Sequence, residues 1–88
     1  MADLTKADGV VAREAHGQTV LLRLRDGEYF TLDEVGVEVW RLCDGTRDVN
    51  GVVAGVLAAF DGPAEEVRRD VIAFVGELVD EGLLSRGA

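Results

Sequence analysis

The side chains that most often act as nucleophile and general base are scarce, because the chain has a single cysteine, Cys43, and a single histidine, His16. Together they could catalyse acyl transfer through a thiolate. His16, however, precedes Gly17 in a turn-like pair, where a solvated side chain is expected. Cys43 falls on the apolar face of a helical pattern, whereas reactive thiols need partly exposed, electropositive surroundings. The sequence therefore predicts a protein that is not an enzyme.

Metal and cofactor chemistry is equally poorly supported. One cysteine and one histidine cannot supply a zinc tetrad, and the acidic residues lack the alternating pattern of a calcium loop. The 11 glycines form neither a phosphate-binding loop nor a dinucleotide fingerprint. We expect no metal and no cofactor.

The charge of the chain restricts its partners. Its 17 acidic and 9 basic residues give a net charge of -8, and the basic ones are scattered among acids. Nucleic acids and anionic membranes require clustered Lys and Arg, so neither is an expected partner. A lone cysteine, the absence of a signal-peptide pattern and the absence of an apolar run near the ~18 residues of a membrane span predict a cytoplasmic protein.

The first third of the chain predicts an antiparallel sheet. Residues 10–12 lead into the His16-Gly17 turn, and Val20, Leu22 and Leu24 then alternate with residues that include Arg23 and Arg25, as in a half-buried strand. Asp26-Gly27 predicts a tight hairpin turn. Residues 28–32 then return as a third strand, which lies at the edge of the sheet.

Three helices follow. Asp33 and Asp48 are candidate amino-terminal caps for the first two, and Gly62-Pro63 marks the start of the third. The second helix contains Gly51 and Gly55, each costing about 1 kcal/mol relative to Ala. This order predicts an α+β, winged helix-turn-helix-like domain over residues 9–84, with flexible ends at 1–8 and 85–88.

Three stretches resemble the PqqD-like family, also called RiPP recognition elements. They are residues 26–36 (DGEYFTLDEVG), 39–45 (VWRLCDG) and 74–84 (FVGELVDEGLL). The order and spacing of the three make the resemblance specific, and it covers about residues 9–84. The family usually has Asn where this chain has Asp33, which preserves the helix cap. Within the family, the chain looks most like the stand-alone leader-binding subunits of lasso-peptide pathways.

The resemblance implies a function. Family members bind the leader of a ribosomally made precursor peptide as an extra strand on the third β-strand, against the third helix. A lasso pathway implies a separate leader peptidase and a cyclase as partners. A similar chain could serve a radical SAM enzyme in pyrroloquinoline quinone assembly. A winged-helix DNA-binding or regulatory protein is a further alternative from the topology, although the charge disfavours it.

The expected site combines the edge strand with the third helix. An edge strand has unpaired backbone N–H and C=O groups that can take up an extended peptide. Tyr29 and Thr31 share one face of the strand and Phe30 and Leu32 the other, and the pattern leaves open which pair faces the core. Trp40 is expected in the core. The predicted peptide-binding residues are Glu28, Tyr29, Phe30, Thr31, Leu32, Val67, Arg68, Val71, Phe74 and Val75, with a solvated position as the alternative for Arg68.

Overall fold

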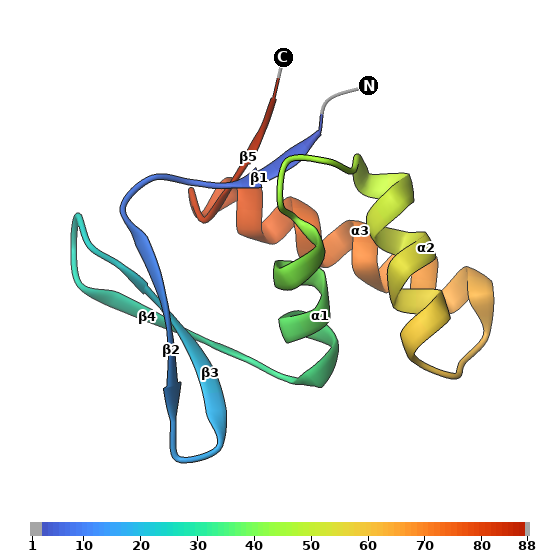
Figure 1. The fold of residues 1–88 in the computed structure, drawn as a ribbon, viewed down its shortest axis with the longest axis horizontal. Helices are drawn as coiled ribbons and strands as arrows, with labels where there is room; N and C mark the ends of the chain where they lie inside the picture. Colours follow the sequence, from blue (N-terminus) through green and yellow to red (C-terminus); the bar gives the residue numbers. More distant parts are fainter. Residues whose placement is uncertain (1–2, 88) are drawn as a thin grey trace.

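The computed structural model describes residues 3–87. Its helices pack together, and a slender sheet projects beside them (Figure 1). In chain order the elements are β1 (Leu4–Lys6), β2 (Val10–Ala15), β3 (Gln18–Arg23), β4 (Glu28–Leu32), α1 (Glu34–Leu42), α2 (Val49–Ala59), α3 (Ala64–Asp80) and β5 (Leu84–Arg86). The predicted α+β architecture, a three-stranded antiparallel sheet followed by three helices, is confirmed. No helix within residues 3–87 is long and apolar enough to cross a membrane.

The three-stranded sheet has the order β2-β3-β4, so β4 lies at an edge, as predicted. The β2–β3 turn uses His16 and Gly17, both with positive φ (53° and 79°), which defines a two-residue primed turn. The predicted tight turn at Asp26-Gly27 is instead a four-residue loop over 24–27, because β3 already ends at Arg23. Gly27 supplies its positive φ of 71°.

The structure shows which face of β4 turns inward. Leu32 is buried and Phe30 packs against the core, whereas Tyr29 is 68% exposed. Phe30 stands opposite Leu21, which is fully buried. Phe30 and Leu32 therefore face the helices, and Tyr29 and Thr31 lie on the outer face of the sheet.

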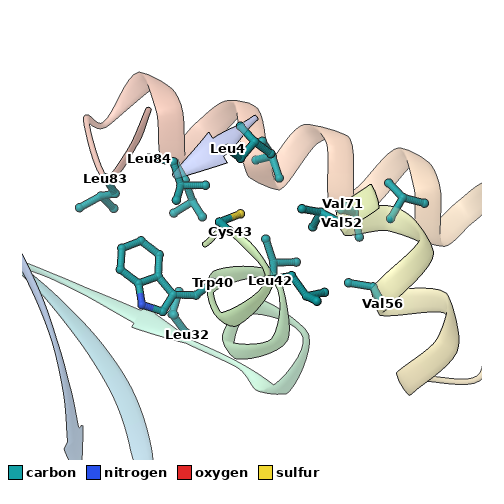
Figure 2. Close-up of a cluster of buried hydrophobic side chains, with 14 of the residues drawn as sticks. Leu4, Leu32, Trp40, Leu42, Cys43, Val52, Val56, Val71, Leu83 and Leu84 are labelled. Atoms are coloured by element: carbon teal, nitrogen blue, oxygen red, sulfur yellow. The ribbon is translucent and has the colours of Figure 1, made fainter. Parts of the chain in front are cut away.

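The core is built where the three helices meet the inner strand residues (Figure 2). Trp40 and Cys43 belong to it, with 7% and 0% of their surfaces exposed, so their expected core positions are confirmed. Asp33 caps α1 by accepting a hydrogen bond from the Gly36 N–H at 2.7 Å, and Asp48 caps α2 in the same way from Gly51 at 3.0 Å. Both predicted caps are thus confirmed.

A second, two-stranded sheet pairs β1 with β5, in the register Leu4↔Arg86 to Lys6↔Leu84. Leu4 and Leu84 enter the core. The expectation of flexible ends over 1–8 and 85–88 is therefore corrected for the residues of these strands, since backbone pairing and burial hold them. The parts of that prediction at residues 1, 2 and 88 lie outside the described residues.

The helix-weakening Gly55 has a packing role. A Cβ built at this position would lie 2.6 Å from Leu42 Cδ1 of α1, closer than real atoms approach. The missing side chain therefore allows α1 and α2 to approach each other closely. A Cβ at Gly76 of α3 would meet nothing within 4 Å.

We expect Gly55→Ala to lower the free energy of unfolding by about 1 kcal/mol, because overpacking costs about 1–3 kcal/mol and the gain in helix propensity offsets about 1. Gly76→Ala is the matched control and should stabilise by up to about 1 kcal/mol. Urea unfolding followed by circular dichroism measures both. Equal stabilisation by the two substitutions would contradict the packing role of Gly55.

Candidate functional site

The hydrogen-bonding direction along β3 follows from the β2–β3 turn. In a two-residue hairpin the closing residues, here Ala15 and Gln18, share a pair of backbone hydrogen bonds, and paired and unpaired positions then alternate. The hydrogen bond from Leu24 N–H to the Gly9 carbonyl, at 2.8 Å, fits this alternation. Even-numbered residues from Gln18 onward therefore direct their backbone groups toward β2, and odd-numbered residues direct theirs toward β4.

The same alternation identifies the free groups of β4. Leu21 directs its N–H and C=O toward β4, so its partner Phe30 directs its own toward β3. The backbone groups of Tyr29 and Thr31 consequently point away from the sheet, along an edge that no other described strand occupies. β4 thus offers hydrogen-bonding groups to an additional strand at alternate positions.

A groove runs between this edge and α3. It consists of two adjoining cavities of about 480 and 440 Å³, which share Thr31, Leu32 and Phe74. We call the two cavities together the edge groove. Its remaining lining residues are Gln18, Asp33, Val35, Gly36, Val39, Asp70 and Val71 in the first cavity and Phe30, Glu77, Leu78, Asp80, Glu81 and Leu83 in the second.

The α3 wall of the edge groove has Phe74 at its centre. The ring is half-buried and packs against the core, and Val71 beside it is nearly buried. Gly36 of α1 lets Phe74 and Leu32 pack close to the helix backbone, because a Cβ there would lie 3.3 Å from Phe74 Cζ and 3.4 Å from Leu32 Cβ. The groove therefore has an apolar centre shared by three elements.

Arg23 fixes one end of the groove. Only 7% of its surface is exposed, and its guanidinium contacts the carboxylates of Asp26 at 2.8 Å, Glu28 at 3.0 Å and Glu81 at 3.1 Å. It also donates to the Glu81 backbone carbonyl at 2.6 Å. Its hydrogen bond to Asp26 lowers the pKa of that carboxyl below its ordinary value. Arg23 therefore ties the β3–β4 hairpin to the carboxyl end of α3.

Five predicted site residues line the edge groove, namely Phe30, Thr31, Leu32, Val71 and Phe74. The other five do not. Glu28 and Tyr29 lie on β4 outside the lining, and Val75 is fully buried in the core. Val67 packs against the core, and Arg68 is exposed and donates to Asn50 Oδ1 of α2 at 3.2 Å.

Several lining residues escaped the sequence analysis, above all Asp70 and Glu77. They stand four residues before and three after Phe74 and thus share its helix face. That spacing could have identified them once Phe74 was placed in the site. Gly36 belonged to the family-like stretch, but only the structure reveals its approach to Phe74.

The two candidate catalytic side chains lie in different environments. His16 is exposed in the β2–β3 turn, while Cys43 is completely buried beside the end of α1. Burial raises the pKa of the Cys43 thiol to about 11. Neither residue lines the edge groove. Among residues 3–87, no three His, Cys, Asp or Glu side chains form a group that could hold a metal ion.

The fold and the groove define a class of small α+β domain that leaves one strand edge open beside a helix. The family model described as coenzyme PQQ synthesis protein D (PqqD) matches residues 18–84. The chain belongs to the PqqD family.

Curated relatives are described as PqqA binding proteins. The one from Rhodopseudomonas palustris strain TIE-1 is 38% identical over 53 residues, which are 60% of this chain and 52% of the relative. That from Bradyrhizobium diazoefficiens is 42% identical with the same coverage, and that from Rhizobium meliloti is 37% identical over 62 residues, or 70% of this chain and 61% of the relative. The matches thus span about half the length of the first two relatives.

Two solved structures are similar over nearly their whole length. TbiB1 in complex with the TbiA(beta) leader peptide has a TM-score of 0.79 and 31% identity, covering 92% of this chain and 94% of that one. A lasso peptide synthetase B1 complexed with the leader peptide has a TM-score of 0.78 and 25% identity, covering 96% and 99%.

We expect Arg23→Met to lower the urea midpoint and to speed hydrogen exchange of the β4 amides, because three carboxylates lose their shared cation. Arg41→Met is the control, since Arg41 is 64% exposed and its ion pair with Glu38 should contribute little. The Asp26 contribution is present above the ordinary pKa of 3.8 and is lost as the pH falls through its lowered value in the folded protein. The urea midpoints of the unmodified protein and of Arg23→Met should therefore approach each other in acid. An unchanged midpoint for Arg23→Met at neutral pH would contradict the role of Arg23.

We expect iodoacetamide to modify Cys43 slowly in the folded protein and rapidly in concentrated urea, because the thiol is buried and protonated. The unfolded chain loses the thiol proton near pH 9.0 and the folded chain near 11, so stability should fall as the pH rises through this window. Cys43→Ala should lack that fall. Rapid modification without denaturant would show that the thiol is accessible.

Proposed function

We propose that this protein binds the leader segment of a ribosomally made precursor peptide and presents it to a separate modifying enzyme, without catalysing a reaction itself. One observation carries the proposal: the outward-facing backbone groups of Tyr29 and Thr31 lie beside a groove with an apolar centre between β4 and α3. A guest peptide in extended conformation can satisfy those groups and fill the groove at the same time.

Strand addition also determines where the guest side chains go. Side chains directly opposite each other in a sheet lie on the same face. Guest residues opposite Phe30 and Leu32 therefore enter the edge groove, and those opposite Tyr29 and Thr31 join the outer face of the sheet. The main-chain hydrogen bonds supply affinity for any extended segment, and the groove selects among sequences.

The relatives support a leader as the guest. The curated ones are described as binding PqqA, and both solved structures contain a leader peptide. Because the similarity to the two leader-peptide complexes, one of which is a lasso peptide synthetase B1, covers over nine-tenths of this chain, we favour a lasso-type leader, with a leader peptidase and a cyclase as the receiving enzymes. The PqqA-binding relatives favour a second candidate, a peptide presented to a radical SAM enzyme. Fluorescence polarisation with labelled TbiA(beta) leader and labelled PqqA distinguishes the two.

The lining of the groove supports a binding role. Its described residues include no Cys, His, Ser, Lys or Arg, so the side chains that face a guest in the groove offer carboxylates, one amide and apolar surface. The buried Cys43 lies outside the lining. We expect the purified chain to leave a bound peptide chemically unchanged, as mass spectrometry after prolonged incubation would show.

We expect Thr31→Pro to weaken leader binding about tenfold or more, since it removes an outward N–H and places a ring against the guest backbone. The substitution is compatible with folding, because proline is tolerated at outward-facing positions of edge strands. Fluorescence polarisation with a labelled leader measures the change.

Two controls make this test specific. Thr31→Val keeps the amide and removes only the hydroxyl, so binding should persist. Ala12→Pro makes the same backbone change at an outward-facing position of β2, the opposite edge of the sheet. If Ala12→Pro abolished binding while Thr31→Pro did not, the guest would occupy β2 and the proposed site would be wrong.

A further inference from the structure

Every charged residue that lines the edge groove is acidic. These residues are Asp33, Asp70, Glu77, Asp80 and Glu81, and no Lys or Arg joins them among the described lining residues. The whole chain has a net charge of -8, so more distant groups reinforce this negative potential rather than cancel it. An acidic guest would therefore be repelled along the full length of the groove.

Only some of these carboxylates are available to a guest. Asp33 caps α1, and Glu81 pairs with Arg23. Asp70 and Glu77 are exposed and take part in no side-chain hydrogen bond or ion pair within residues 3–87. Asp80 is also exposed and takes part in no side-chain hydrogen bond or ion pair within these residues, but it lies six positions from Phe74. Asp70 and Glu77 are therefore the available carboxylates that flank the Phe74 ring.

The positions of Asp70 and Glu77 match the repeat of an extended peptide. They are separated by seven residues of α3, a rise of about 10 Å, with Phe74 between them. Alternate residues of a strand face the same side and are about 7 Å apart. The guest residues two positions before and two positions after a central groove-facing residue are therefore about 13 Å from each other. Flexible Lys or Arg side chains easily accommodate the difference of about 3 Å.

Resting on the proposed function, we propose that the guest is a basic peptide segment, in which an apolar residue packs on Phe74 and the residues two positions before and after it are Lys or Arg that face Asp70 and Glu77. The edge strand can pair with any extended peptide, and this charge pattern restricts the peptide sequences that bind well. The cationic Arg68, which could have favoured an acidic guest, contacts Asn50 of α2 instead.

The charge pairs act on selectivity more than on total affinity. An exposed ion pair contributes about 1.4- to 5-fold in a binding constant, and salt weakens it. Two such pairs should therefore favour a Lys-containing guest over its Gln counterpart by about 2- to 25-fold at low ionic strength. A Glu-containing guest should bind more weakly still, because attraction becomes repulsion.

The experiment is a selection from a random-sequence peptide library displayed on mRNA, with the full chain immobilised. We expect the enriched peptides to show Lys or Arg on both sides of an apolar residue with one residue between each. The same selection on Asp70→Asn/Glu77→Gln should lose the basic positions and keep the apolar one. Asp8→Asn/Asp61→Asn removes two exposed carboxylates outside the groove and should retain the basic pattern.

The possible results separate the two proposals. Enriched peptides that are neutral or acidic at these positions, with binding still sensitive to Thr31→Pro, would overturn the basic-segment proposal and leave the proposed function standing. Basic enrichment that persisted on Asp70→Asn/Glu77→Gln would overturn the assignment to these carboxylates. No enrichment for the unmodified chain would count against both the charge pattern and peptide binding.

Discussion

The site depends on β4 being attached at both ends and left unpaired in between. At one end, Arg23 connects the hairpin to Glu81 at the end of α3, and at the other, Asp33 leads directly into α1 as its cap. These attachments hold the strand beside α3 without letting it pack flat against the helix. The resulting space is lined by Phe74 and by Gly36, which lets the Phe74 ring pack close to α1. Polar contacts thus position an apolar groove that neither element forms alone.

Much of the fold could be predicted because its signals are local. The alternation from Val20, the caps Asp33 and Asp48 and the helix start at Gly62-Pro63 each depend on residues close in sequence, and the structure has the corresponding elements. The β1–β5 pair was missed because three-residue strands show little periodicity and their pairing joins opposite ends of the chain. The early end of β3 was missed for a related reason, since the ion pairs of Arg23 include Glu81, 58 residues away.

Only part of the candidate site could be predicted, because some of its signals are local in sequence and others depend on how distant elements pack. Family-like stretches and the edge position identified β4 and the centre of α3, and the structure brings Phe30, Leu32 and Phe74 together around one groove. The orientation of α3 could not be derived, because apolar residues such as Val67, Val71, Ile72, Phe74 and Val79 cover a broad part of the helix surface and allow several rotations. That rotation decides that Asp70 rather than Arg68 faces the groove.

The β1–β5 pairing also affects how the domain can be joined to other proteins. Leu4 stands opposite Arg86, so the two ends of the described chain leave the fold at neighbouring points (Figure 1). A polypeptide fused before β1 or after β5 would start from nearly the same place and have a similar reach. Gene fusions in either order are therefore geometrically equivalent for this fold, and a short linker closing the ends would permit circular permutation.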